Sequence, residues 1–279
     1  MRILVTNDDG VHAPGLRALA NAMCELAGDH EIVVVAPDSE YSGAGASLGA
    51  LHEIRPVVRE ATIPDCPASA IWSVSGPPAL CVMFARLGAF GAPFDLIVAG
   101  INPGANVGRA VYHSGTVGAA LTARNGRISG VAVSRAVSGY GVEGQAWDEA
   151  IAGISWDSAA RVGKVVVQAL LDDLPAEPVV VNINVPDVAM DEIKGWRYTA
   201  VGHVPPRTVA EAALVPIHGE DGAFRVEMGW GDKVELDEWT DGGAVEAGYV
   251  AVTYLSRLGH EDRDDVAAAG KALDELLRS

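Results

Sequence analysis

Residues 1–10 read MRILVTNDDG, and this stretch decides the fold. The apolar run at 3–5 is typical of a short strand buried in a sheet, and the polar turn after it contains two adjacent carboxylates, Asp8 and Asp9. Apolar residues then recur at helical spacing over 15–26. A buried strand that leads through a polar turn into an amphipathic helix predicts the opening unit of an α/β domain.

The same alternation of strand and helix continues to residue 186. Apolar runs rich in β-branched residues, typical of buried parallel strands, occupy 31–36, 95–99, 131–134 and 179–185, and helical patterns begin near Thr116 and cover 159–171. This order predicts a doubly wound, mostly parallel, Rossmann-like sheet with right-handed crossovers. Ligands of such sheets bind beyond the carboxyl ends of the strands.

The pattern changes after Pro186, where Pro and Gly interrupt shorter amphipathic segments. Strand-like pieces cover 195–201, 224–230 and 248–255, and a final helical pattern covers 264–277. We therefore expect a main domain at 1–186 and, at 187–279, an extension with a β-hairpin and a terminal helix that packs on the main domain or reaches a neighbouring subunit. Residues 135–157 are expected to form a flexible or partly helical excursion.

Composition limits the possible partners. The chain of 279 residues has a formal net charge of −17, which argues against binding to a nucleic-acid backbone because phosphate contacts need clustered Lys and Arg. A small phosphate ligand would need a metal ion or backbone amides to overcome this charge.

Cys24, Cys66 and Cys81 show no paired spacing and are expected to be reduced thiols. Neither a signal peptide nor a membrane span is expected, and we infer a cytoplasmic protein.

The strongest local signal is the pair Asp8 and Asp9 at the end of the first strand. Two neighbouring anions repel each other, so a cation is their natural partner, and oxygen ligands suit Mg²⁺, Mn²⁺ or Ca²⁺ better than zinc. The alternative is a solvated turn, since these residue types favour turns in general. Their place at the carboxyl end of a strand favours the ligand site.

Two further loops are predicted at the same rim of the sheet, and a third segment can bind an anion. The Gly-rich segments 41–47 and 100–106 offer neutral oxygen ligands, and each by itself would be an ordinary loop between strand and helix. Ser114, Gly115 and Thr116 precede a helix of small residues, where free amides and the helix dipole can bind an anion, or where the hydroxyl simply caps the helix. Together these loops point to one site.

At this point the residues resemble the survival protein E (SurE) family of 5′/3′-nucleotidases. The resemblance covers 1–134, where the segment MRILVTNDDGVHAPG at 1–15 and the segment AGIN at 99–102 are highly specific, and it returns at 181–186 and 240–255. It implies that residues 1–186 are a catalytic domain that hydrolyses nucleoside 5′- and 3′-monophosphates. It also implies a homodimer or homotetramer that exchanges carboxyl-terminal elements between subunits.

The resemblance also implies roles for single residues. The metal ligands matched are Asp8, Asp9, Ser42 and Asn102, for one Mg²⁺ or Mn²⁺ per subunit, and the phosphate-contacting residues matched are Asn106, Ser114, Gly115 and Thr116. Asp8 and Asp9 are also the candidates to orient the attacking water. One stretch departs from the family pattern, because Ser39-Glu40-Tyr41 stands where the family usually has an Arg-rich segment. A positively charged substrate contact is therefore not expected there.

Other readings of the same residues remain open or are disfavoured. A nucleotide- or metal-binding regulatory module without turnover is the alternative function. A covalent aspartyl-phosphate route would need two Asp residues separated by one residue after the first strand, and a dinucleotide-binding dehydrogenase would need the Gly-x-Gly-x-x-Gly fingerprint; the chain has neither in that turn. His113 and His12 are possible general acids, although loop histidines without a catalytic role are at least as common.

Overall fold

The computed structural model describes residues 1–137, 151, 153–204, 209–232, 234–257, 271–273 and 277. Within these residues, nine strands form one sheet in the order β3-β4-β2-β1-β5-β6-β7-β11-β8, and β9 and β10 form a separate hairpin. The strands are β1 (Arg2–Thr6), β2 (Glu31–Pro37), β3 (Val58–Glu60), β4 (Ala70–Val74), β5 (Leu96–Pro103), β6 (Ser129–Arg135), β7 (Val180–Val185), β8 (Trp196–Tyr198), β9 (Val209–Pro216), β10 (Phe224–Trp230) and β11 (Val250–Leu255). The helices are α1 (Pro14–Cys24), α2 (Pro78–Arg86), α3 (Gly115–Asn125), α5 (Asp157–Asp172) and α6 (Asp241–Glu246), with 3-10 turns at η1 (Gly108–Tyr112) and η2 (Met190–Glu192).

The centre of the sheet is parallel and doubly wound, as the sequence predicts. The chain runs from β1 outward to β2 and β4, then returns to β5 on the other side of β1 and continues outward through β6 and β7. The direction of winding therefore changes between β1 and β5. In sheets of this kind, the crevice outside the carboxyl ends of the strands at the switch point is where ligands bind.

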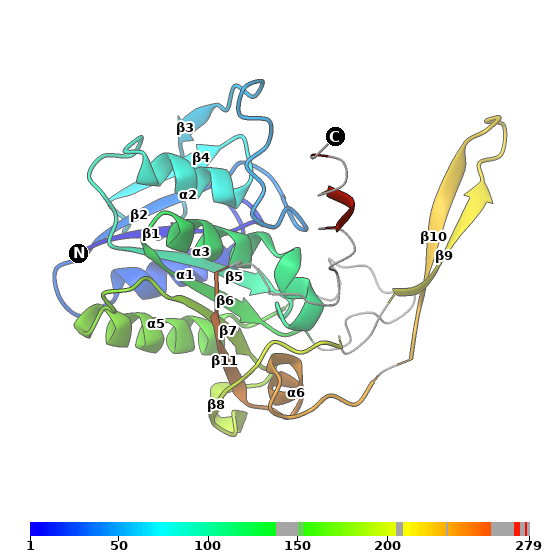
Figure 1. The fold of residues 1–279 in the computed structure, drawn as a ribbon. Coiled ribbons are helices and arrows are strands. Elements are labelled where there is room, and N and C mark those ends of the chain that lie inside the picture. The colour runs from blue at the N-terminus through cyan, green and yellow to red at the C-terminus, as the bar shows by residue number, and fades with distance from the viewer. Residues whose placement is uncertain are drawn as a thin grey trace.

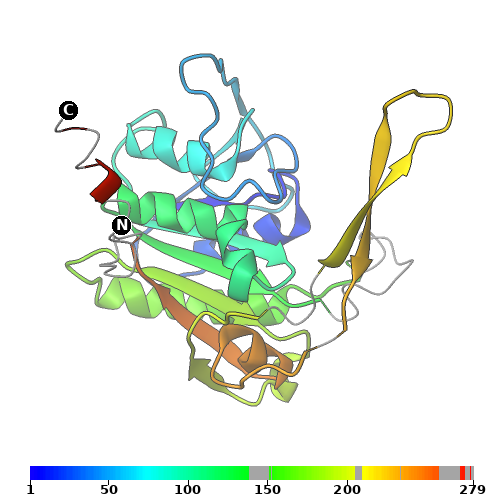
Figure 2. The same cartoon turned by 45° about the vertical axis from the view of Figure 1, so that its right-hand side comes forward.

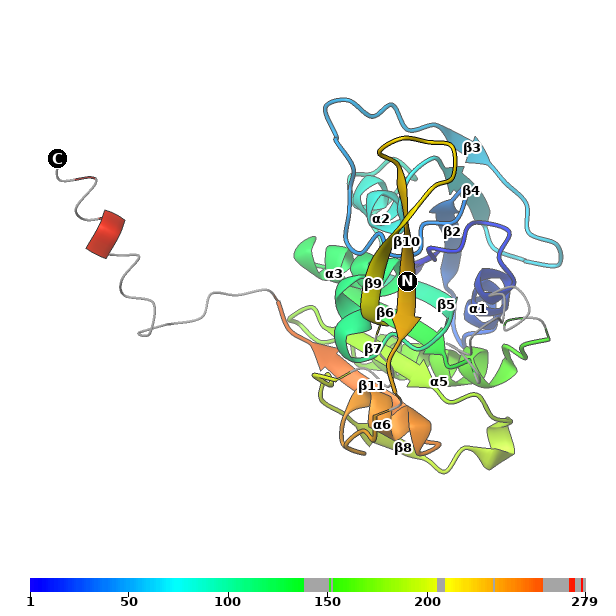
Figure 3. The ribbon, with the colours of Figure 1, turned by 90° about the vertical axis from the view of Figure 1, so that its right-hand side faces the viewer.

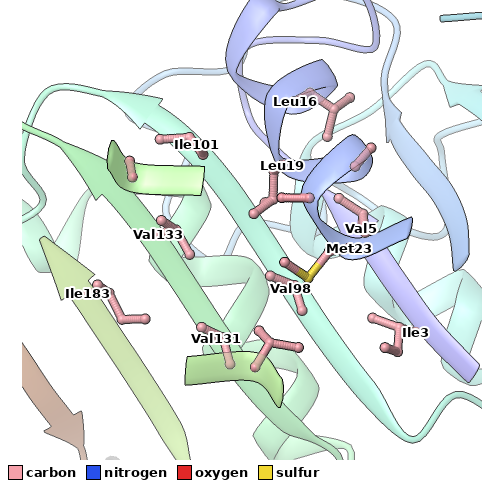
Figure 4. Packing of buried hydrophobic residues seen from close by; sticks show 14 of the residues in the cluster. Ile3, Val5, Leu16, Leu19, Met23, Val98, Ile101, Val131, Val133 and Ile183 are labelled. Atoms are coloured by element: carbon pink, nitrogen blue, oxygen red, sulfur yellow. The ribbon is translucent and has the colours of Figure 1, made fainter. Parts of the chain in front are cut away.

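Helices cover both faces of the sheet. Helices α1 and α5 lie on one face and α2 and α3 on the other (Figure 1). Side chains alternate along β1, so that Ile3 and Val5 face α1 while Leu4 faces the opposite layer. Figure 4 shows the hydrophobic core between the sheet and helices α1 and α5, in which Leu19 and Met23 of α1 pack against the sheet. Burial of both faces explains why the central strands are continuous apolar runs.

A close approach fixes the start of α1 beside the end of β5. A Cβ atom on Gly15 would lie 2.1 Å from the backbone oxygen of Ile101, so no larger residue fits at this position without movement. Helix α1 begins just after the loop that contains the paired carboxylates. This contact therefore helps to fix the position of that loop relative to the end of β5.

Residues beyond Pro186 complete one edge of the main sheet. Strand β11 pairs antiparallel with β7, and β8 pairs parallel with β11. The expected hairpin is present as β9 and β10 and stands apart from the sheet (Figures 1 and 2). The division at residue 186 stays a prediction. The expected terminal helix at 264–277 lies mostly outside the described residues, as does the part of the expected excursion at 138–150 and 152.

Sequence patterns did not identify β3 and β4, which form one edge of the sheet, or helix α2, which packs on the sheet. The end of β5 was also placed too early, because the strand continues to Pro103 and pairs with β6 through a register shift between Gly100 and Asn102. Asn102 therefore projects from the end of a strand rather than from a loop.

Two expectations about cysteines and membranes can be compared with the structure. The thiols of Cys24, Cys66 and Cys81 are free, and Cys81 is buried. Among the described residues, no helix is both long and apolar enough to span a lipid bilayer.

Candidate functional site

The two carboxylates lie in a tight turn directly after β1. The side-chain amide of Asn7 donates to the backbone oxygen of Gly10 at 3.0 Å, and Gly10 adopts a φ of 102° that favours glycine. This closed turn holds Asp8, only 2% exposed, at the carboxyl end of the strand next to the switch point. The sequence therefore places a carboxylate where the fold collects ligands.

Asp8 is held by the first turn of α3. The hydroxyl of Thr116 donates to Asp8 Oδ1, and the backbone of Thr116 is a second hydrogen-bond partner of the same carboxylate. A Cβ on Gly115 would lie 2.7 Å from both Cβ and Oδ2 of Asp8, so glycine is needed for this close packing. The amino end of α3 also favours a negative charge at this position.

Asn102 reaches the same place from the end of β5. Its amide nitrogen donates to the backbone oxygens of Gly104 at 2.7 Å and Pro103 at 3.2 Å. These bonds fix the orientation of the amide group, and they leave Asn102 Oδ1 3.4 Å from the Thr116 hydroxyl. The atom of Asn102 on the side of Thr116, whose hydroxyl also contacts Asp8, is therefore an oxygen, the atom that a cation would use.

Burial and mutual repulsion perturb both carboxylates. Burial is the largest cause that raises the pKa of Asp8, and the Thr116 hydroxyl opposes it. Burial, and then the charges of Asp8 and Glu40, raise the pKa of Asp9 from 3.8 to about 8. Asp9 Oδ2 is buried without a hydrogen-bond partner in the described part of the chain. A bound cation would supply both the missing partner and the missing positive charge.

The loop after β2 packs directly on the carboxylate turn. The Tyr41 amide donates to the backbone oxygen of Asp8 at 2.7 Å, which brings Ser42 to the same rim. Ser42 is exposed, and its hydroxyl donates to Glu40 Oε1 at 2.5 Å. Sequence reasoning did not identify Glu40 as a site residue, although the acidic residue was visible beside the Ser-Gly motif.

The oxygen donors that meet at this rim fit Mg²⁺ or Mn²⁺. Two carboxylates, one amide oxygen and one hydroxyl oxygen form a set of hard ligands with no nitrogen or sulfur, which suits these cations. Among the described residues, no group of three or more His, Cys, Asp or Glu is placed to hold a metal ion. A site here would therefore depend on the neutral oxygens of Ser42 and Asn102 as well as on Asp8 and Asp9.

Ser114, Gly115 and Thr116 form the start of α3, as expected. Ser114 is the N-cap, since its hydroxyl accepts a hydrogen bond from the Val117 amide at 3.1 Å. The helix dipole of α3 is directed at the carboxylate turn, where Asp8 already accepts hydrogen bonds from Thr116. The cap is thus present, and the role of this turn in phosphate binding stays a prediction.

Asn106 lies in a buried polar network beyond the end of β5. Its amide nitrogen donates to Ser134 Oγ at 2.9 Å and its backbone nitrogen to Asn184 Oδ1 at 2.7 Å. The side chains of Asn182 and Asn184 both donate to the backbone oxygen of Asn106. Sequence reasoning missed this network. The available signal was two Asn residues two positions apart in an otherwise apolar strand, because such residues share one face.

A buried carboxylate ties the Asn106 loop to the carboxyl-terminal part of the chain. Asp241 is fully buried and accepts hydrogen bonds from the amides of Gly108 and Gly202, each at 2.9 Å. The loop that contains Asn106 and Gly108 is therefore held from two sides, by β7 and by the start of α6.

The two candidate histidines are exposed. Within the described residues, the side chains of His12 and His113 form no hydrogen bond or ion pair with the carboxylates. The backbone oxygen of His113 accepts from the Gly45 amide at 3.0 Å, which joins the Gly-rich loop to the start of α3. This contact gives His113 a structural role through its backbone.

Comparisons with known proteins identify the family that the chain resembles. The family model described as "Survival protein SurE" matches residues 3–207. The "5′/3′-nucleotidase SurE" of Erwinia tasmaniensis is 36% identical over 260 residues, which cover 91% of this chain and 90% of that protein. The "5′-nucleotidase SurE" of Acinetobacter baumannii is 39% identical over 219 residues, which cover 74% and 77%. The crystal structure of the SurE protein from Aquifex aeolicus superposes with a TM-score of 0.71 at 28% identity and covers 99% of each chain.

Proposed function

The chain belongs to the survival protein SurE family, and from this premise we propose that it hydrolyses nucleoside 5′- and 3′-monophosphates with one Mg²⁺ or Mn²⁺ per subunit. It is a 5′-nucleotidase, since curated relatives that are 36 to 40% identical over most of its length have that name. The cation and the use of both phosphate positions are the proposed part.

One observation supports the cation above all others. Asp8 and Asp9 lie side by side in a largely buried turn, the pKa of Asp9 is raised to about 8, and its Oδ2 atom has no partner in the described residues. Isolated carboxylates are costly to bury, so a turn that keeps two of them needs a positive ligand. The oxygens of Ser42 and Asn102 would complete the set.

Each group of the site then has a task in phosphate hydrolysis. When bound, a divalent cation offsets the phosphate charge and acidifies a water molecule. The start of α3 and Asn106 are the groups that the family resemblance assigns to the remaining phosphate oxygens, and the helix dipole of α3 favours an anion there. Asp8 or Asp9 orients the attacking water. Positioning and electrostatic stabilisation supply most of the catalysis in phosphoryl transfer, so a site without Lys or Arg among these residues can work.

A homodimer or homotetramer is also proposed. The hairpin of β9 and β10 stands clear of the sheet and exposes Leu214, Phe224, Val226 and Met228 (Figure 2). A two-stranded hairpin with an exposed apolar face is marginally stable in water, so a neighbouring subunit is its natural cover.

The test is a panel of substrates and metals. Phosphate release from 5′- and 3′-monophosphates of several nucleosides is measured with Mg²⁺, with Mn²⁺ and with EDTA, for the parent chain and for Asp9→Asn. We expect activity only with a cation and a loss of about 100-fold or more in Asp9→Asn, since several kcal/mol of charge stabilisation are removed and about 1.4 kcal/mol is tenfold. Full turnover in EDTA, or unchanged turnover in Asp9→Asn, would contradict the proposal. Absence of turnover on every substrate would favour the regulatory module instead.

A further inference from the structure

Glu40 is a third carboxylate at the site, and it has a defined contact there. Its Oε1 atom accepts two hydrogen bonds from Ser42, one from the hydroxyl at 2.5 Å and one from the backbone amide at 2.9 Å. The neighbouring amide of Tyr41 is bonded to the backbone of Asp8. The turn that contains Glu40 is therefore fastened to the carboxylate turn.

The hydrogen bond to Glu40 determines what Ser42 presents to the site. A serine hydroxyl has one hydrogen and two lone pairs, and a free hydroxyl can turn its hydrogen in any direction. In this structure the hydrogen is directed to Glu40, at a distance expected for a strong bond to an ionised acceptor. Both lone pairs of the Ser42 oxygen are then free for another ligand.

Charge is the second contribution of Glu40. Its negative charge raises the pKa of both Asp8 and Asp9, so it acts on the whole site. In the part of the chain that the structure describes, no Lys, Arg or His forms an ion pair with any of these three carboxylates. The adjacent carboxylates of Asp8 and Asp9, with the charge of Glu40 nearby, repel an anionic substrate and favour a doubly charged cation.

We propose that Glu40 is a positioning residue of the cation site, which orients the Ser42 hydroxyl so that its oxygen binds the metal ion. The inference rests on the proposed function, because it needs the cation site formed by Asp8, Asp9, Ser42 and Asn102. Removal of a residue that hydrogen-bonds to a metal ligand commonly lowers metal affinity by about 10- to 100-fold.

Binding of Mn²⁺ to the metal-stripped protein tests this proposal without any measurement of activity. Isothermal titration calorimetry gives the Kd for the parent, Glu40→Ala, Ser42→Ala and the double variant. We expect Glu40→Ala to raise the Kd about 10- to 100-fold. We also expect this loss to be at least about threefold smaller when Ser42 is already alanine, because the two residues act through one hydrogen bond.

Glu177→Ala is the matched control, because Glu177 is an exposed glutamate that precedes β7 at the opposite end of the sheet. It removes the same charge and should bind Mn²⁺ like the parent. A parent-like Kd in Glu40→Ala, or an equal loss in both backgrounds, overturns the inference. If Asp9→Asn and Ser42→Ala also bind like the parent, the cation site itself is wrong, and the proposed function fails with it.

Discussion

Asp9 shows how a single side chain can couple folding to a ligand. It is held next to the buried carboxylate of Asp8 and near the exposed carboxylate of Glu40, and it is itself largely shielded from water. A carboxyl group of this kind stays protonated to a much higher pH than usual when no cation is present. A cation must therefore displace a proton in order to bind.

The stability of the metal-free protein should consequently decrease with pH. The pKa of Asp9 is about 8 in the folded chain and near 3.8 in the unfolded chain, so between these values the folded state binds more protons. The stabilising effect is complete below pH 4 and is lost as the pH rises through 8. Urea denaturation of EDTA-treated protein at pH 5 to 8 should show this decline in the parent and a weaker one in Asp9→Asn. Parallel curves for the two proteins would contradict the raised pKa.

Residues of the site differ in how readily the sequence identifies them. Asp8 and Asp9 directly follow a recognisable strand, and Asn102 lies in a Gly-rich segment at the end of another, so patterns along the chain make them candidates and the family resemblance gives them their expected roles. Glu40 and Asn184 depend on contacts between segments far apart, one through a turn that packs on Asp8 and one through a strand beside the Asn106 loop. Such contacts follow from strand order, which local patterns do not determine.

At the scale of elements, the start of α3 is the part of the scaffold that holds the site. Its first turn provides two hydrogen bonds to Asp8, the cap at Ser114 and the close contact at Gly115. A helix is stiffer than a loop, so a ligand fixed by its first turn keeps one geometry. Precision at the cation site thus depends on the fit between α3 and the turn after β1.

Gly115→Ala should damage this fit. The new methyl group would lie 2.7 Å from Asp8 Oδ2, closer than real contacts allow, so Asp8 or the helix must move. We expect the Kd for Mn²⁺ to rise about tenfold or more and the free energy of unfolding to fall by about 1–3 kcal/mol. Calorimetry and urea denaturation measure the two effects.

Gly163→Ala on α5 is the control for the Gly115 variant, since its methyl group would meet a Val133 side-chain atom at 3.3 Å, away from the carboxylates. It should keep the parent affinity for Mn²⁺. An equal Kd for Mn²⁺ in Gly115→Ala and Gly163→Ala would contradict this prediction. It would mean that Asp8 can move aside for the methyl group without loss of metal binding.

Elements with long, regular patterns were predicted well, and some short ones were not. The strands at the centre of the sheet, and helices α1, α3 and α5, are visible in the sequence because burial on both sides imposes continuous apolar runs and helical spacing. Strand β3 has three exposed residues and creates no periodic signal by itself, whereas the short strand β8 lies within the strand-like segment predicted at 195–201. The pairing of β3 with β4 determines that it is a strand.

At the scale of the molecule, the apolar face of the hairpin leads to a prediction about assembly. Leu214 and Val226 lie directly opposite each other across β9 and β10, and they are 67% and 57% exposed. Figure 3 shows the hairpin in front of the main sheet, and in the described part of the chain β9 and β10 pair only with each other. The double variant Leu214→Lys/Val226→Lys should therefore have a lower molar mass in solution than the parent, measured by light scattering after size exclusion.

Glu227→Lys is the control for this assembly test, because Glu227 alternates with Val226 and faces the other side of the hairpin. It should keep the parent mass. A parent chain that is already monomeric, or a double variant of unchanged mass, would contradict the role of the hairpin. Binding of Mn²⁺ should be the same in all three proteins, since the proposed ligands come from residues 8–102 of one chain.

The antiparallel pairing of β7 with β11 has a consequence for how the protein is made. The strands and turns that supply Asp8, Asp9, Ser42, Asn102 and Thr116 leave the ribosome early, whereas β7 cannot gain its neighbour on that side until residues 250–255 have been synthesised. At ordinary rates of translation this leaves an open apolar edge on the nascent chain for several seconds. If the proposed cation binds during this interval, it holds one end of the sheet together before the other end closes. The supply of the ion would then influence the yield of folded protein as well as its activity.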